Sequence, residues 1–248
     1  MLQSKPEKAL EVLVKVNGKE EAHIILAEIK NTVTKRSGKL FSYGVSIIVF
    51  GVLLSVFQQF VGINVVLYYA PEIFKSMGSR TETALLQTII VGGVNLLFTV
   101  IAIQSVDKVG RKPLMIVGAI GMALAMFAIG TAFFSGSLGM FALICMLVYV
   151  AAFAMSWGPV TWVLLSEIFP NDVRGKALAV AVAAQWIANY LVSWTFPMMD
   201  KNRYLLEKFN HGFAYWIYGA MGLLAAFFVW KYIELHDLAI QVHLSVIL

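Results

Sequence analysis

Six long apolar segments dominate the pattern of hydrophobic and polar positions along the chain, and short polar stretches separate them. Each segment is long enough to cross a hydrocarbon layer of about 30 Å as a helix rising about 1.5 Å per residue. In that layer a segment must pair its own backbone groups, which favours helices. We therefore predict six membrane-spanning helices, at about 44–70, 83–106, 113–134, 139–166, 176–199 and 212–233.

The first forty residues have a different pattern, because they are polar and strongly charged. Ser4 and Pro6 can open a short helix that Gly18 ends, and a second short helix follows with Glu20 and Glu21 in its first turn. Each helix carries one apolar stripe, which is typical of docking against the cytosolic face of the same protein. The predicted fold is an all-α membrane protein, a six-helix bundle at 41–234 preceded by short cytoplasmic helices at 1–40.

Composition supports a membrane protein, since 60% of the residues are hydrophobic and 13% are charged, against about a quarter charged in soluble domains. The net charge is +5, but the basic residues lie beside the predicted spans, where anionic lipid is a sufficient partner, so nucleic acid is not expected. The single cysteine, Cys145, rules out a disulfide framework or a Cys-rich metal site. All four histidines lie outside the spans, so we expect no metal site.

Basic residues also predict how the chain is oriented. The polar segments on one side of the predicted bundle hold fourteen Lys and Arg, and those on the other side hold five. Basic loops stay in the cytoplasm, so both termini are predicted to be cytoplasmic in a multi-pass protein of the cell inner (plasma) membrane.

The first span carries three amide side chains, Gln58, Gln59 and Asn64. Unpaired amides are costly in hydrocarbon, so they must face protein, water or a ligand. On an unbroken helix Asn64 would point about 240° around from Gln58, but a break near Gly62 would let the amides converge. Tyr68 follows shortly after. Amides and aromatic rings together favour a site for a neutral polyhydroxylated ligand; the alternative is that the amides hydrogen-bond neighbouring helices together.

Other spans add polar and aromatic positions. Asn95 lies in a polar and small-residue stripe of the second span, a pattern that by itself is typical of close helix packing. In the fourth span Gly158 and the proline after it interrupt the helix, and Trp162 lies one turn beyond Gly158. Its place beside the interruption favours a role in the site; the alternative is that Trp162 is an aromatic anchor at the membrane interface. Gln185, beside Trp186, begins a polar stripe of the fifth span that favours a cavity.

Two charged groups occur at predicted cytoplasmic span ends. Asp107, Gly110 and Arg111 follow the second span, and Glu167 and Arg174 follow the fourth. Paired charges at helix ends can hold neighbouring spans together and separate during a conformational change. The alternative is that these are ordinary positive-inside loops with incidental acids.

Three strings of residues resemble the sugar-porter family of the major facilitator superfamily: QQFVGINVVLYYAPEIF at 58–74, DKVGRKPL at 107–114 and SEIFPNDVRGKA at 166–177. The similarity covers about 40–232 and matches the C-terminal half of that family. SWGPVTWVLLSEIFP and AAQWIANYLVSWTFPMMDKN extend the likeness toward bacterial proton-coupled D-xylose transporters. The resemblance implies a major facilitator fold and an N-terminal six-helix half as a partner.

The resemblance also implies roles for individual residues. Gln58, Gln59 and Asn64 would bind sugar hydroxyls, and Trp162 and Gln185 would complete the site. Its lining would be Tyr68, Asn95, Phe153, Gly158 and Trp186. Asp107, Gly110 and Arg111 would pair with Glu167 and Arg174 as a cytoplasmic latch. No cofactor is implied.

The expected function is transport of a monosaccharide, D-xylose by proton symport, as the C-terminal half of a transporter. Acidic residues lie only near the span ends, so the proton-coupling acid of the family is not expected in this chain. The tail at 235–248 differs from the family's usual continuation and is not expected to contribute function. Three alternatives stay open: an inactive remnant of a truncated or split gene, a hexose transporter half, and a membrane enzyme or receptor, which the absence of catalytic clusters in the spans disfavours.

Overall fold

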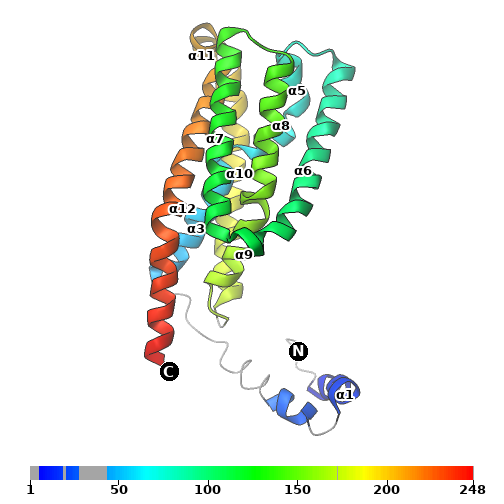
Figure 1. The fold of residues 1–248 in the computed structure, drawn as a ribbon, viewed down its shortest axis with the longest axis vertical. Helices are drawn as coiled ribbons and strands as arrows, with labels where there is room; N and C mark the ends of the chain where they lie inside the picture. Colours follow the sequence, from blue (N-terminus) through cyan, green and yellow to red (C-terminus); the bar gives the residue numbers. More distant parts are fainter. Residues whose placement is uncertain (1–5, 19–20, 28–43, 172, 248) are drawn as a thin grey trace.

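The protein is a bundle of long helices that stand side by side (Figure 1). The computed structural model describes residues 6–18, 21–27, 44–171 and 173–247, and the regular elements within these ranges are all α-helices. The predicted all-α membrane fold is confirmed.

Six spans are long and apolar enough to cross a membrane among the described residues. They are Val45–Tyr68, which comprises α3 (Val45–Phe60) and α4 (Ile63–Tyr68); α6 (Thr81–Val109); α7 (Arg111–Ser135); Met140–Ile168, which comprises α8 (Met140–Met155) and α9 (Trp157–Ile168); α10 (Arg174–Asp200); and Gly212–Ile233, within α12 (Gly212–Ile247). Their order is the predicted one. The helices extend past the predicted ends of several spans, because a helix can continue through polar residues once it has left the hydrocarbon.

Shorter helices lie at the two ends of the bundle. α5 (Ala70–Ser76) and α11 (Arg203–Phe209) lie at one end, whereas α1 (Pro6–Asn17) lies beyond the opposite end, where α12 also finishes (Figure 1). Gly18 has φ +81°, so α1 ends where the sequence predicts. Residues 21–27 are helical, and the predicted continuation of that helix lies outside the described residues. The predicted boundaries between the cytoplasmic segment at 1–40, the bundle at 41–234 and the tail at 235–248 stay predictions.

Two spans are broken, both at positions that the sequence indicates. α3 ends at Phe60, and Gly62 has φ +92°, a left-handed conformation that favours glycine, before α4 begins. The fourth span breaks at Ser156, which separates α8 from α9. Pro159, in the first turn of α9, has no N–H to donate to the preceding helix.

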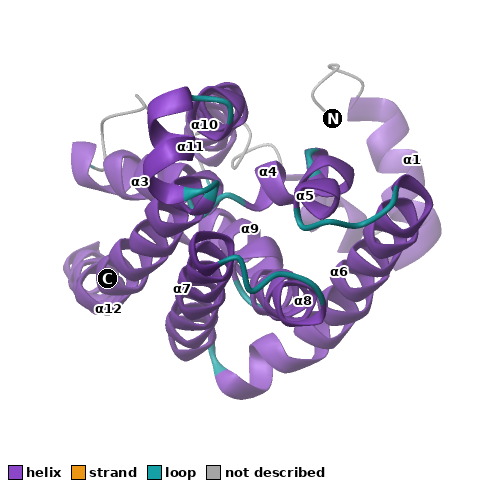
Figure 2. Ribbon diagram, turned by 90° about the horizontal axis from the view of Figure 1, so that it is seen from above, coloured by secondary structure: helices purple, strands orange, loops and turns teal. Residues whose placement is uncertain are grey.

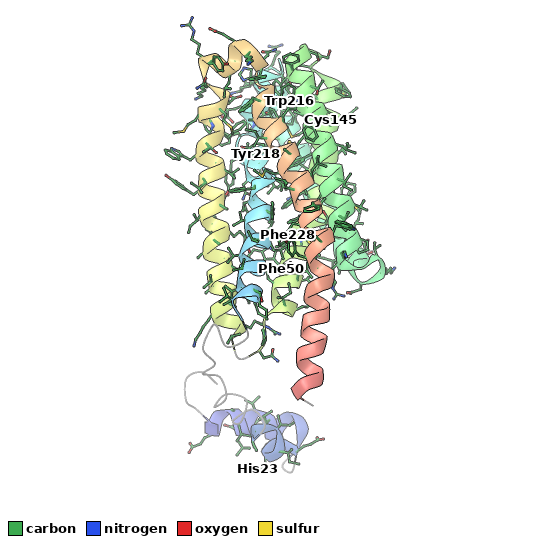
Figure 3. All side chains as sticks on the ribbon, turned by 90° about the vertical axis from the view of Figure 1, so that its left-hand side faces the viewer. His23, Phe50, Cys145, Trp216, Tyr218 and Phe228 are labelled. Carbon is green, nitrogen blue, oxygen red and sulfur yellow. The ribbon has the colours of Figure 1, made fainter. Side chains whose placement is uncertain are left out.

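α3 packs against α10 and α12, while α7 packs between α8 and α12 (Figure 2). Phe50 of α3 stacks on Phe228 of α12 with ring centroids 5.1 Å apart, and both residues are labelled in Figure 3. α6 is the least buried of the six spans, and Ile89 and Ile103 on it are 70% and 65% exposed. Exposed apolar side chains on a membrane helix are positioned for lipid or for another bundle.

Candidate functional site

Gln58 lies near the end of α3 and is 2% exposed. Its Nε2 donates to the carbonyls of Trp157 at 3.0 Å and of Gly158 at 3.3 Å. These carbonyls belong to the first turn of α9, directly after the break at Ser156. Gln58 therefore links the end of α3 to the broken fourth span.

The side-chain oxygen of Gln58 accepts two further hydrogen bonds. Gln185 Nε2 of α10 donates to it at 2.6 Å, and Gln59 Nε2 donates at 3.5 Å. A glutamine amide has two N–H hydrogens and one oxygen with two lone pairs. All the hydrogen-bonding capacity of Gln58 is thus used within the protein.

Asn64 joins the same group from the other side of the Gly62 break. Its Nδ2 donates to Gln59 Oε1 at 2.6 Å. The left-handed turn at Gly62 replaces the rotation of about 240° that a continuous helix would impose between Gln58 and Asn64. Gln58, Gln59, Asn64 and Gln185, which we call the amide cluster, thus form one hydrogen-bonded chain from α3, α4 and α10.

One atom of the amide cluster is left over. Gln185 Oε1 is buried and has no hydrogen-bond partner within the described part of the chain. A buried acceptor without a donor costs about 1–3 kcal/mol. A hydroxyl of a ligand, or a water molecule, would remove that cost.

The predicted lining residues occupy different environments. Phe153 is 9% exposed, and its ring lies beside Gly158, where an added Cβ would be 3.3 Å from Phe153 Cε1. Tyr68, Trp162 and Trp186 are 55%, 45% and 64% exposed in this chain. Asn95 is half-buried on α6, and its backbone carbonyl accepts a hydrogen bond from the Thr99 hydroxyl. Among the described residues, its side chain makes no hydrogen bond to the amide cluster. The hydrogen bonds therefore unite the amides, Phe153 is buried, and the side chains of Tyr68, Trp162 and Trp186 are exposed.

The polar stripe of α10 continues beyond Gln185 into a second contact. Ser193 Oγ donates to Asn189 Oδ1 at 3.2 Å, and the Ser193 carbonyl accepts from the Tyr69 hydroxyl at 3.2 Å. Asn189 is 7% exposed. This part of the stripe fastens α10 to the segment that follows α4, a contact that the sequence did not indicate.

Two buried residues that support the site were not predicted. The indole nitrogen of Trp157 donates to the Met115 carbonyl at 3.0 Å, which holds the start of α9 against α7. The Tyr149 hydroxyl donates to the Val61 carbonyl at 2.8 Å. Trp157 belongs to the interrupted stretch of the fourth span that the sequence indicates, although not as a site residue, whereas Tyr149 lies in an apolar run that resembles any core segment.

Charged residues gather where α6 ends and α7 begins, around Gly110. Arg111 Nη2 lies 2.7 Å from Glu167 Oε1 and 3.7 Å from Asp107 Oδ1, so it joins α7 to α9. Gly110 alone separates α6 from α7 and has φ +89°, which favours glycine. Arg174 Nε donates to the Phe169 carbonyl at 3.1 Å, at the end of α9. The structure brings Asp107, Arg111 and Glu167 together, whereas Arg174 bonds to the end of α9. The role of these residues as a latch stays a prediction.

Known proteins resemble the whole described bundle. The family described as "Sugar (and other) transporter" matches residues 1–237. The chain is 63% identical over 236 residues to the D-xylose-proton symporter of Escherichia coli K12, across 94% of this chain and 48% of that protein. It is 41% identical to the glucose facilitated diffusion protein of Zymomonas mobilis, across 94% of this chain and 50% of that protein.

A solved structure shows the same arrangement of helices. The proton:xylose symporter XylE bound to 6-bromo-6-deoxy-D-glucose superposes with a TM-score of 0.78 and 62% sequence identity, across 93% of this chain and 49% of that one. The chain spans about half the length of the curated relatives that it matches. On the combined evidence of the fold, the family match and these identities, the chain belongs to the sugar transporter family of the major facilitator superfamily.

Proposed function

We propose that this chain is the C-terminal half of a proton-coupled sugar transporter and that its amide cluster binds D-xylose. The observation that carries the proposal is the convergence of four amides from three helices, with the buried Gln185 Oε1 left without a donor. The 63% identity to a D-xylose-proton symporter supports the choice of sugar.

The chemistry of the cluster suits an uncharged saccharide. Sugar hydroxyls both donate and accept, and they need partners of both kinds when water is removed. Gln185 Oε1 can accept from a hydroxyl, while Gln59 and Asn64 each keep one amide hydrogen beyond the bonds described above. Gln58 has no capacity to spare, so its contribution to ligand binding would require an exchange of partners. Trp162 and Trp186 offer exposed indole faces for the apolar side of a sugar ring.

Transport would need a second six-helix bundle. In major facilitator transporters the substrate lies between two such halves, and their relative rocking exposes the site to one side and then the other. The exposed positions of Tyr68, Trp162 and Trp186 are consistent with a face that this second half covers. The acidic residues of this chain lie near the span ends, so we assign the proton-coupling acid to the other half.

We place the Arg111–Glu167 pair, and both termini, on the cytoplasmic side. α1, the end of α12 and the junction between α6 and α7 lie at one end of the bundle (Figure 1). The segments at this end carry most of the Lys and Arg, as cytoplasmic loops do. Asp107, Arg111 and Glu167 would then close the cytoplasmic side until the bundle opens.

A hexose is the second candidate substrate. The Zymomonas mobilis relative is a glucose facilitated diffusion protein, and the superposed symporter holds a glucose derivative. The two sugar classes differ by one hydroxymethyl group, and a pocket discriminates such a group by only about 1–3 kcal/mol. Competition of unlabelled D-glucose with labelled D-xylose would rank the two.

Uptake of radiolabelled D-xylose tests the proposal. Cells lacking other xylose transporters would express this chain alone, the N-terminal half of the Escherichia coli symporter alone, or both together. We expect uptake only when both are present, with loss of uptake in a Gln185→Ala variant that still reaches the membrane. Uptake by this chain alone would overturn the half-transporter assignment, and no uptake by the pair, beside an active full-length symporter, would favour an inactive remnant.

A further inference from the structure

The break at Gly62 is enclosed by two tyrosines that lie outside the amide cluster. Tyr149 comes from α8 and is 0% exposed, and Tyr218 comes from α12 and is 4% exposed. Figure 3 shows Tyr218 on α12 beside α3. Tyr149 hydrogen-bonds to the backbone of the break, and the ring of Tyr218 lies against Gly62.

Tyr149 contacts the break through a hydrogen bond. Its hydroxyl donates to the Val61 carbonyl at 2.8 Å. Helix ends leave carbonyls without their usual partners four residues later, and a buried carbonyl needs another donor. Around the break the backbone bonds run from Gly62 N to Gln59 O and from Val66 N to Gly62 O. The Tyr149 bond therefore fixes the peptide group between the end of α3 and the left-handed residue.

Tyr218 contacts the break through its ring. A Cβ added to Gly62 would lie 2.8 Å from Tyr218 Cγ and 2.9 Å from Cδ2, so the ring covers the Cα of Gly62. Its own hydroxyl is buried without a hydrogen-bond partner in the described residues. Tyr218 therefore contacts the turn through the faces of its ring and not through its hydroxyl, and the ring blocks movement of the turn toward α12.

The break sets the geometry of the amide cluster. Gln59 lies two residues before Val61 and Asn64 lies three residues after it, and these two side chains meet at 2.6 Å. A rotation of the Val61 peptide group would swing α4 relative to α3 and separate them. We propose that Tyr149 and Tyr218 are positioning residues that hold this turn and thereby hold Asn64 against Gln59. This inference rests on the proposed sugar-binding function of the cluster.

Equilibrium binding of radiolabelled D-xylose to membranes that contain this chain and the N-terminal half tests the proposal. Tyr149→Phe removes one oxygen and keeps the ring, and we expect a dissociation constant about 3- to 10-fold higher, the effect of one misplaced hydrogen bond. Tyr218→Leu removes the ring from Gly62 and should have an effect of similar size. The matched control is Tyr215→Phe, since Tyr215 is an equally buried tyrosine of α12 whose ring stacks on Phe133 at 5.1 Å.

A double-mutant cycle separates positioning from a general loss of structure. If the tyrosines act through Asn64, Tyr149→Phe should weaken binding in the wild-type background and cause no further loss in an Asn64→Ala background. Equal losses in both backgrounds, equal losses in the Tyr215→Phe control, or unchanged binding in both Tyr149→Phe and Tyr218→Leu would overturn the inference. Failure of the unmutated pair to bind D-xylose would instead reject the proposed function.

Discussion

Gln185 offers the sharpest test of the site, because its two amide atoms have opposite effects on the empty protein. Its Nε2 makes a 2.6 Å hydrogen bond to Gln58, and its Oε1 is buried without a donor. Gln185→Met keeps the approximate volume and removes both groups. Loss of the bond costs about 0.5–1.5 kcal/mol, whereas removal of the unpaired acceptor returns about 1–3 kcal/mol. The free energy of unfolding should therefore change little or rise by up to about 2.5 kcal/mol.

The same substitution should weaken sugar binding. A hydroxyl that donates to Gln185 Oε1 would face a thioether and remain unpaired in a dry site, at a cost of about 1–3 kcal/mol, or about 5- to 150-fold in the dissociation constant. Stability without sugar and affinity for sugar should thus move in different directions. Few structural defects produce this combination, since damage to the fold lowers both.

Thermal unfolding of the detergent-solubilised pair of halves, with and without D-xylose, measures both quantities at once. Ligand stabilises the folded state by about 2.7 kcal/mol at a hundred times its dissociation constant, so a tenfold weaker site loses about 1.4 kcal/mol of that shift. Thr195→Val on the same helix is the control, because within the described part of the chain the Thr195 hydroxyl donates to backbone carbonyls of α10 itself. A less stable protein with an unchanged sugar-induced shift would refute the reasoning and show that Gln185 only joins helices.

Three further predictions follow from other parts of the bundle. Gly62→Ala should lower both the melting temperature and D-xylose affinity, because a left-handed alanine costs about 1–2 kcal/mol and its Cβ would meet the Tyr218 ring. Arg111→Gln should shift the free energy of unfolding by less than about 1 kcal/mol, as exposed ion pairs do, yet change the uptake rate at saturating sugar. Asn210→Ala should unfold more readily than Asn210→Gly by about 1 kcal/mol, since residue 210 has φ +46°, with equal D-xylose binding in both.

The sequence predicted the six spans because length and hydropathy are properties of each segment alone. It also predicted the break near Gly62, because three amides on one apolar helix could converge in no other way. It could not place α6 and α7 one residue apart, since the charged residues around Gly110 resemble a loop. A helix that has left the hydrocarbon tolerates such residues, and hydropathy then says nothing about where it ends.

Contacts between spans were harder to predict than the spans themselves. Gln58 donates to carbonyls 99 and 100 residues further along the chain, and no periodicity within α3 gives the register of α9 against it. The hydrogen bond from Tyr149 to Val61 could not be predicted for the same reason, because it depends on which face of α8 packs against the break. The polar residues of the site could be found from the sequence, while the buried groups that hold them required packing between helices.

Buried polar side chains hydrogen-bond to the backbone beside both helix breaks. A broken membrane helix exposes carbonyls that hydrocarbon cannot satisfy, and a buried amide needs acceptors and donors that an apolar bundle lacks. Tyr149 donates to the Val61 carbonyl, which the end of α3 leaves without a backbone partner, and Gln58 donates to the Trp157 and Gly158 carbonyls in the first turn of α9. The Val61 carbonyl would be costly to bury without a donor, and the Gln58 amide would be costly to bury without acceptors. Within the amide cluster, Gln185 Oε1 is the buried atom that this mutual arrangement leaves for a ligand.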